Sequence, residues 1–455
     1  MKKLYILVLL LFSLSSCEKW LDVDPRSVVK EEEMFNDVKG FRSALLGVYT
    51  KMSGTKLYGS NLTIGFVDVL AQYYNVESGQ HSFYATANYN YDETATYINN
   101  IWGESYNTIA NINNILTWLQ EKQSLFSPAE YDLIKAEAMA LRAFLHFDLL
   151  RLYAPSYTAS PNAKAIPYVN KVTNKPFPQL TVSQVLDAAI ADLEEATDLL
   201  KTVDPLSPEY SGVAVTTSTD TPEFFTFRYE RMNYFAVAGT LARIYLWKGD
   251  KEKAAEYATI AKRNTTGGQL FQLFSEKTWD NSDSYFNSEA SLNSKLIMSE
   301  GRKQVIYETD LYGSLDTRFK DWFKYYPGSN EEFMGKYMRP IPRTGNPPNL
   351  MLMRVEEMVY ILSECAPDDS TAIAQLNSVR SYYGLKGANA LVLGNCVPEE
   401  ELFKEYRKTF IGEGQLFFYI KRKNYTEIPF SVVEDVQKAY VLPIPDLEIE
   451  FGLID

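Results

Sequence analysis

The chain has 455 residues, with 45 lysines and arginines against 58 aspartates and glutamates, for a formal net charge of −13 at pH 7. This acidic balance, without a basic block, argues against nucleic-acid binding and against electrostatic docking on anionic lipid. The length suffices for one large domain or two closely packed halves. Aromatic residues make up 14% of the chain and 32 residues are tyrosine, a side chain that suits half-wet binding surfaces as well as cores.

The N-terminal residues predict export and a lipid anchor. Lys2 and Lys3 precede the apolar run Leu4–Leu14, which is too short for a bilayer span of roughly 20 apolar residues. Two small serines then lead to Cys17, the pattern that a bacterial lipoprotein peptidase accepts. We therefore expect residues 1–16 to be a lipoprotein signal peptide and Cys17 to carry the lipid. An ordinary secretory signal with an incidental cysteine is the alternative.

Most of the remaining pattern is helical, because apolar residues recur at steps of three and four. Capping boxes at Ser127 and Thr181 mark two helix starts. Two alanine-rich helices around Gly249-Asp250 resemble a tetratricopeptide hairpin, in which small residues let helices approach closely. Helices are expected at residues 98–119, 128–153, 182–200, 233–248, 350–365, 370–383 and 398–411, with a partner helix directly after Asp250.

Three long, aromatic-rich connections are the candidate binding regions: 73–97, 264–294 and 312–349. Connections of this length in a compact domain are usually functional or disordered, and aromatic residues argue against disorder. Aromatic rings stack on sugar rings, while polar side chains bind the hydroxyls. The candidate ligand contacts are Tyr73, Tyr74, Asn75, Tyr89, Tyr91, Trp279, Tyr285, Trp322, Tyr325 and Tyr326. The alternative for each is a buried residue that holds its loop against the helices.

Signals for catalysis are weak. The two histidines, His81 and His146, lack metal-ligand spacing, so we expect no metal site and no cofactor. His146 lies within an apolar helical stripe and reads as structural. Phosphate-loop and nucleophile motifs are not found in the sequence, and with 58 acidic residues no glycosidase pair can be selected. Cys365 and Cys396 either pair or remain two separate thiols.

A series of short motifs follows a fixed order along the chain. The motifs are Cys17–Pro25, Ala44–Tyr49, Ala136–Tyr153, Val185–Ala196, Leu241–Asp250, Asp316–Arg318, Arg354–Glu364, Leu376–Arg380, Glu405–Phe417 and Leu442–Ile449. Together they resemble the SusD/RagB-like outer-membrane lipoproteins. Ser363, Cys365 and the Gln415-Leu416 pair depart from the family pattern at packing positions. Most of these motifs are expected to be structural and not to form a binding site.

The resemblance implies an all-α fold, in which tetratricopeptide-like helix hairpins form a scaffold that carries long irregular loops. We expect one SusD-like domain over 17–455, with an N-terminal part to residue 215 and a C-terminal part from 216. The resemblance further implies a lipoprotein at the cell-surface face of the outer membrane. Such a protein binds a nutrient oligosaccharide, without catalysis, and passes it to a SusC-like TonB-dependent transporter. A peptide ligand, a surface glycoside hydrolase and a purely structural lid without a ligand of its own are the alternatives.

Overall fold

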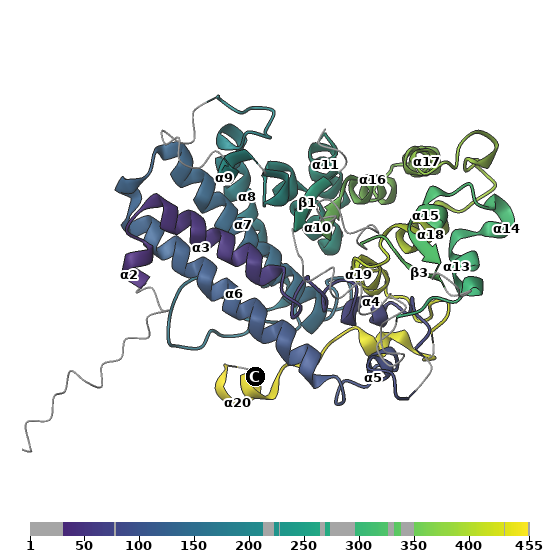
Figure 1. Cartoon of the computed structure of the whole chain (residues 1–455), viewed down its shortest axis with the longest axis horizontal. Helices are drawn as coiled ribbons and strands as arrows, with labels where there is room; N and C mark the ends of the chain where they lie inside the picture. Colours follow the sequence, from purple (N-terminus) through teal and green to yellow (C-terminus); the bar gives the residue numbers. More distant parts are fainter. Residues whose placement is uncertain are drawn as a thin grey trace, which may run out of the picture.

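The fold is almost entirely helical, as the resemblance implied (Figure 1). The computed structural model describes residues 31–76, 79–212, 223–226, 228–263, 269–273, 296–325, 332–337, 350–431 and 433–453. The expected signal peptide and Cys17 therefore lie outside the described residues. Within these ranges, no helix combines the length and the apolar character that crossing a bilayer requires.

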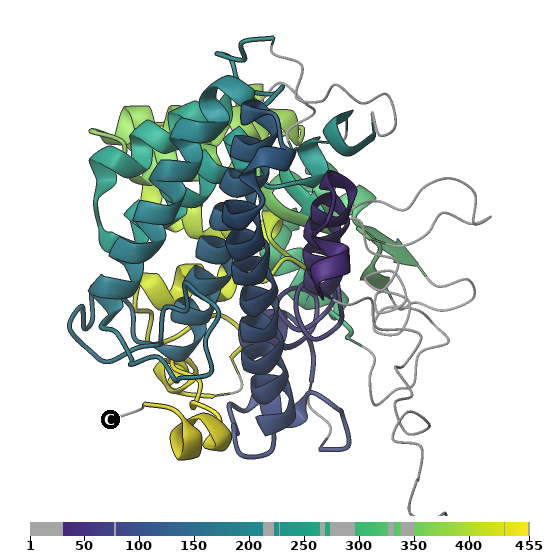
Figure 2. The ribbon, with the colours of Figure 1, turned by 90° about the vertical axis from the view of Figure 1, so that its left-hand side faces the viewer.

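The N-terminal half is organised around one long buried helix, α7 (Pro128–Tyr153). Ser127 caps its first turn by accepting a hydrogen bond from the backbone of Glu130 at 3.3 Å, as predicted. Three helices lie around it: α3 (Val38–Met52), α6 (Ala95–Glu121) and α8 (Val182–Val203), the last with the expected capping box at Thr181. Figure 2 shows α6 running along one side of the molecule, with α3 next to it.

The expected alanine-rich hairpin is formed by α10 (Tyr234–Lys248) and α11 (Lys251–Lys262). Gly249 ends α10 with φ 80°, a left-handed conformation that glycine adopts without steric cost. Ala254, Ala258 and Ala261 of α11 are fully buried, and α11 packs closely on α10. The tetratricopeptide-like geometry predicted here is confirmed.

The C-terminal half contains α13 (Glu300–Tyr307), α16 (Val355–Glu364), α17 (Asp369–Tyr382), α18 (Pro398–Thr409) and α19 (Gln415–Arg422). The short α-helices are α2 (Glu31–Met34), α4 (Phe66–Leu70), α5 (Tyr84–Ala87), α9 (Glu223–Thr226), α14 (Thr309–Tyr312), α15 (Thr317–Asp321) and α20 (Asp446–Phe451). Single 3-10 turns cover Gln123–Leu125, Arg228–Glu230, Gly387–Asn389 and Val436–Ala439.

Two small antiparallel sheets correct one prediction. Strand β1 (Gln269–Leu273) pairs with β4 (Leu350–Arg354), and β2 (Phe323–Tyr325) pairs with β3 (Glu332–Met334). The helix predicted at 350–365 was therefore wrong over its first five residues, and α16 begins only at Val355. The run Leu-Met-Leu-Met is buried throughout, and a short continuous apolar run does not distinguish a strand from a helix.

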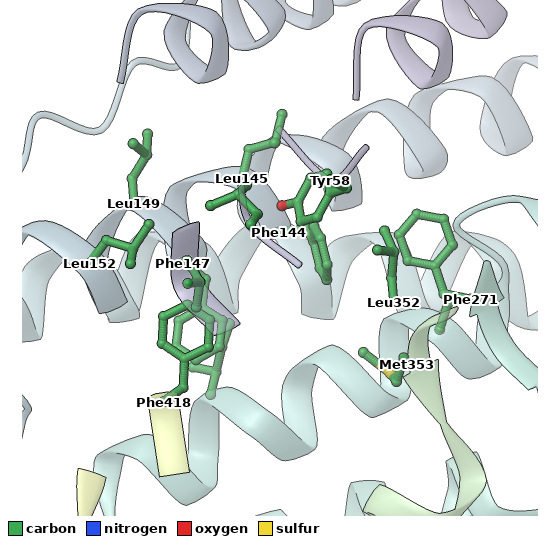
Figure 3. Packing of buried hydrophobic residues seen from close by; sticks show 14 of the residues in the cluster. Tyr58, Phe144, Leu145, Phe147, Leu149, Leu152, Phe271, Leu352, Met353 and Phe418 are labelled. Carbon is green, nitrogen blue, oxygen red and sulfur yellow. The ribbon is translucent and has the colours of Figure 1, made fainter. Parts of the chain in front are cut away.

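The core follows α7 and includes both halves of the chain (Figure 3). Phe144 of α7 meets Phe271 of β1 edge-on, with ring centroids 5.5 Å apart. Phe147 and Phe418, from α7 and α19, lie together in the same cluster, and Arg151 stacks on both rings. This packing joins residues far apart in the sequence. The division at 215/216 stays a prediction.

Several of the recognised motifs form buried ion pairs. Arg318 binds both Asp316, at 2.7 Å, and Glu405, at 2.8 Å, and Arg380 binds Glu405 at 2.9 Å. Burial alone would raise the pKa of Glu405, but Arg318, Lys408 and Arg380 hold it well below its usual range. Similar pairs join Arg142 to Asp192, Arg243 to Glu357, and Glu137 to both Arg228 and Arg231. The structural role expected for these motifs fits this arrangement.

Candidate ligand-binding site

Four of the predicted contact residues hold their loop to the scaffold. Tyr73, Tyr74 and Tyr89 are buried, and Tyr91 is half-buried. Three of the hydroxyls donate hydrogen bonds to backbone oxygens: Tyr73 to Arg407 at 2.9 Å, Tyr89 to Leu70 at 3.2 Å and Tyr91 to Ala439 at 2.6 Å. The hydroxyl of Tyr74 donates to the carboxylate of Asp68 at 2.7 Å. These rings act as anchors in this structure. Their role as ligand contacts stays a prediction.

Asp68 connects this loop to the backbone between α18 and α19. The carboxyl group of Asp68 accepts hydrogen bonds from the backbone nitrogens of Gly412, at 2.7 Å, and Gly414, at 3.1 Å. Both glycines have positive φ, and a Cβ on Gly414 would lie 2.4 Å from the backbone oxygen of Leu62. Glycine is therefore required for this close approach. Burial raises the pKa of Asp68 to about 7.

Glu413, between the two glycines, forms ion pairs with two cations that lie next to the Trp322 ring. Lys336 lies 2.6 Å from the Glu413 carboxylate, and Arg354 Nε donates to it at 2.8 Å. The Lys336 ammonium is also 4.0 Å from the centre of the half-exposed Trp322 ring. Burial lowers the pKa of Lys336 to about 7, although Glu413 opposes the shift. The indole is thus fixed from behind by a lysine that is itself fixed by Glu413.

Trp322 continues into an aromatic edge that we define as Trp322, Tyr382 and Tyr383. Tyr383 meets Trp322 edge-on at 5.7 Å and Tyr382 at 5.1 Å, measured between ring centroids. The hydroxyl of Tyr383 donates to Glu356 at 2.6 Å, which fixes the middle ring. Tyr382 is 78% exposed. Sequence reasoning placed both tyrosines in a helix and missed them, although the Tyr-Tyr pair directly before Gly384 marks the helix end.

The ends of two predicted loops meet at Asn75. The backbone nitrogen of Asn75 donates to the oxygen of Ile297 at 2.7 Å, and its side-chain oxygen accepts from the nitrogen of Ser299 at 2.8 Å. Arg302 adds a hydrogen bond to the backbone oxygen of Tyr74 at 2.6 Å. Of the remaining candidates, Trp279, Tyr285 and Tyr326 lie outside the described residues, and Tyr325 is placed by its backbone as the last residue of β2.

The histidines and cysteines have structural surroundings. His146 is fully buried, its Nε2 accepts from the backbone nitrogen of Val169 at 2.9 Å, and burial lowers its pKa to about 3. Cys365 and Cys396 are free thiols, which answers the question of their pairing. In the part of the chain that the structure describes, no group of three or more histidine, cysteine or acidic side chains could hold a metal ion.

Known proteins resemble this chain in sequence and in fold. Residues 19–219 match the SusD-like family model described as "Starch-binding associating with outer membrane". Among curated proteins of Formosa agariphila, SusD-like protein P25 is 26% identical over 166 residues, which cover 34% of this chain and 31% of that protein. SusD-like protein P2 is 24% identical over 58% of this chain and 47% of its own length. The N-terminal part of this chain, residues 19–219, is thus SusD-like in sequence.

Solved structures of SusD-like proteins share the fold over nearly the whole chain. A SusD superfamily protein from Bacteroides thetaiotaomicron has a TM-score of 0.71 at 20% identity, covering 91% of this chain and 98% of that one. A putative sugar binding protein from Bacteroides vulgatus has a TM-score of 0.69 at 20% identity, with 92% and 97% covered. A laminarin binding SusD-like protein has 0.64 at 16% identity, with 92% and 98% covered. The predicted all-α SusD-like fold is confirmed. The alignments with the two curated SusD-like relatives span less than half of those proteins.

Proposed function

We propose that this SusD-like protein is a surface-exposed outer-membrane lipoprotein that binds a nutrient oligosaccharide and delivers it to a SusC-like TonB-dependent transporter. The aromatic edge carries the proposal. Tyr382 is exposed and Trp322 is half-exposed, while Lys336 and Tyr383 fix the indole from behind and from the side. A partly exposed ring that its neighbours hold in place suits the apolar face of a sugar, because stacking then requires little ordering of the protein.

The cellular setting is part of the same proposal. The family description places its members in association with the outer membrane. Lipidation at Cys17, after removal of residues 1–16, would hold the single domain expected over 17–455 beside its transporter. Because tethering raises the effective concentration of the two partners, modest affinities are sufficient for transfer.

Two buried carboxylates near the aromatic edge, Glu413 and Asp68, are not suited to catalysis. Burial alone would raise the pKa of Glu413, but Arg354 and Lys336 hold it below its usual range. A glycosidase acid needs a raised pKa and access to the substrate. Asp68 has the raised pKa, yet it is fully buried and enclosed by Tyr74 and two backbone nitrogens. Neither acid is suited to protonate a glycosidic oxygen.

Calorimetric titration of the purified protein with laminarin oligosaccharides and a broad glycan panel tests the ligand class. We expect saturable binding to at least one glycan, and Trp322→Ala or Tyr382→Ala should weaken it about tenfold, because each removes a stacking ring. Trp118→Ala is the matched control. Trp118 lies near the C-terminal end of α6, and its ring stacks on that of Phe35, with the ring centroids 5.8 Å apart.

Three results would contradict the proposal. Binding to peptides of a protein digest but to no glycan selects the peptide alternative. Turnover of a polysaccharide by the purified protein selects the hydrolase. When the protein is purified in detergent from the native membrane, a large TonB-dependent barrel should co-purify with it. Its consistent absence would contradict the proposed delivery to a transporter.

A further inference from the structure

Arg407 of α18 is a cation without a counter-ion among the described residues. It is 8% exposed, and its guanidinium contacts two rings, Phe403 at 5.6 Å and Phe430 at 5.3 Å from the ring centres. Within that part of the chain, no carboxylate or carbonyl oxygen accepts a hydrogen bond from it. Arg318 and Arg354, by contrast, each bind a buried carboxylate. Burial lowers the pKa of Arg407 to about 10, so the group stays charged at neutral pH.

A second guanidinium, that of Arg302, contacts the Phe430 ring as well. Arg302 of α13 lies 4.8 Å from the centre of Phe430, and its charge adds to the lowering of the pKa of Arg407. Phe430 itself has φ 68°, a left-handed conformation that is uncommon for a bulky residue. Such backbone positions cluster at ligand-binding sites. Two arginines from different helices therefore flank one half-exposed ring held in an unfavourable backbone conformation.

The pair lies next to the first candidate loop. Tyr73 donates to the backbone oxygen of Arg407 at 2.9 Å, and Arg302 donates to the backbone oxygen of Tyr74 at 2.6 Å. The rings of Phe403 and Phe430 contact the Arg407 guanidinium, whose N–H donors have no acceptor among the described residues. An anionic group would supply that acceptor.

We propose that Arg407 and Arg302 form a subsite for the anionic group of an acidic oligosaccharide, either the carboxylate of a uronic acid or a sulfate ester. This proposal rests on the glycan-binding function proposed above. Planar guanidinium groups bind both anions through paired hydrogen bonds. A buried cation without a partner is unfavourable. The binding free energy of an incoming anion is therefore more favourable at Arg407 than at an arginine that is already paired.

Calorimetric titration of the mature full-length chain with sodium sulfate and with sodium glucuronate tests the subsite, against sodium chloride and glucose at matched ionic strength. We expect saturable binding of at least one of the two anions, and the one that binds identifies the group. Arg407→Met should weaken it at least tenfold, and Arg407→Lys should retain part of it. Arg263→Met is the matched control, because Arg263 is exposed at the end of α11.

Two outcomes would overturn the subsite: neither anion gives saturable binding, or Arg407→Met binds as the wild type does. If Arg407→Met fails to fold, Phe430→Gly replaces it, since glycine tolerates the positive φ and removes the shared ring; unchanged anion binding in that variant overturns the proposal equally. Laminarin titrations on the same samples separate the two proposals. Neutral glycan binding without anion binding refutes the subsite alone, whereas anion binding without any glycan binding refutes the glycan function.

Discussion

Replacing Glu405 by glutamine tests whether the buried ion network of α15, α17 and α18 stabilises the fold. The Glu405 carboxylate is fully buried and accepts from Arg380 at 2.9 Å, Arg318 at 2.8 Å and Lys408 at 3.5 Å. Glutamine keeps the shape but removes the charge, and its amide nitrogen would face these donors. All three cations would then remain in the interior without their shared anion.

The expected loss follows from what each cation retains. Breaking a buried ion pair typically costs about 3–5 kcal/mol. Arg318 keeps its pair with Asp316 at 2.7 Å, and Lys408 keeps Glu308 at 2.6 Å. Among the residues that the structure describes, Arg380 alone is left without a carboxylate closer than 4.0 Å. Because two of the three cations stay paired, we expect Glu405→Gln to lower the free energy of unfolding by about 3 kcal/mol, the lower end of that range.

Urea unfolding followed by circular dichroism measures this loss, provided that the slope of the transition is unchanged. Glu195→Gln is the control, since Glu195 pairs with Lys135 at 2.6 Å on the exposed surface of α8 and should cost less than about 0.5 kcal/mol. The double variant Arg380→Met/Glu405→Gln should lose less than the sum of the single variants. A loss below about 1 kcal/mol for Glu405→Gln would refute a stabilising role for the network.

Two further predictions concern Asp68 and the glycines. The folded pKa of Asp68, about 7, lies above the ordinary 3.8, so its contribution to stability is complete below about pH 4 and is lost as pH rises to about 7. The stability advantage of the wild type over Asp68→Asn should therefore fall by about 3 kcal/mol between pH 4 and 7 in urea titrations, and a constant difference would contradict the assignment. Gly414→Ala should destabilise by about 2 kcal/mol or more, because it combines φ 71° with the approach to Leu62. Gly47→Ala, in open space on α3, should stabilise by about 0.5–1 kcal/mol, and equal thermal shifts for the two variants would refute this explanation.

The helices were predictable because their signals are local. Ser127 and Thr181 cap α7 and α8 as expected, and the alanines after Gly249 identified the hairpin. The strand at 350–354 was not predictable, since its extended conformation depends on pairing with β1, about eighty residues earlier in the chain. Buried ion pairs have the same property: Arg318 and Glu405 are 87 residues apart, and sequence gives no rule that pairs them.

The candidate site was predictable only as a region. Aromatic content drew attention to the loop of Tyr73 and Tyr89, but burial depends on tertiary contacts, and both hydroxyls bind scaffold oxygens. Trp322 was selected by its type of side chain alone, and its contacts with Lys336 and Arg354 could not be predicted because they depend on tertiary packing. Tyr382 escaped notice because an exposed residue at a helix end leaves no trace in an apolar periodicity.

The two attachments around residues 274–295 have an engineering consequence. Before this stretch, β1 is fixed by its pairing with β4, and after it, Ile297 and Ser299 are fixed by Asn75. Each flank is thus fixed to the scaffold by contacts of its own. Sequence changes designed between residues 274 and 295 can therefore leave β1, Ile297 and Ser299 unaltered, together with the contacts that hold them.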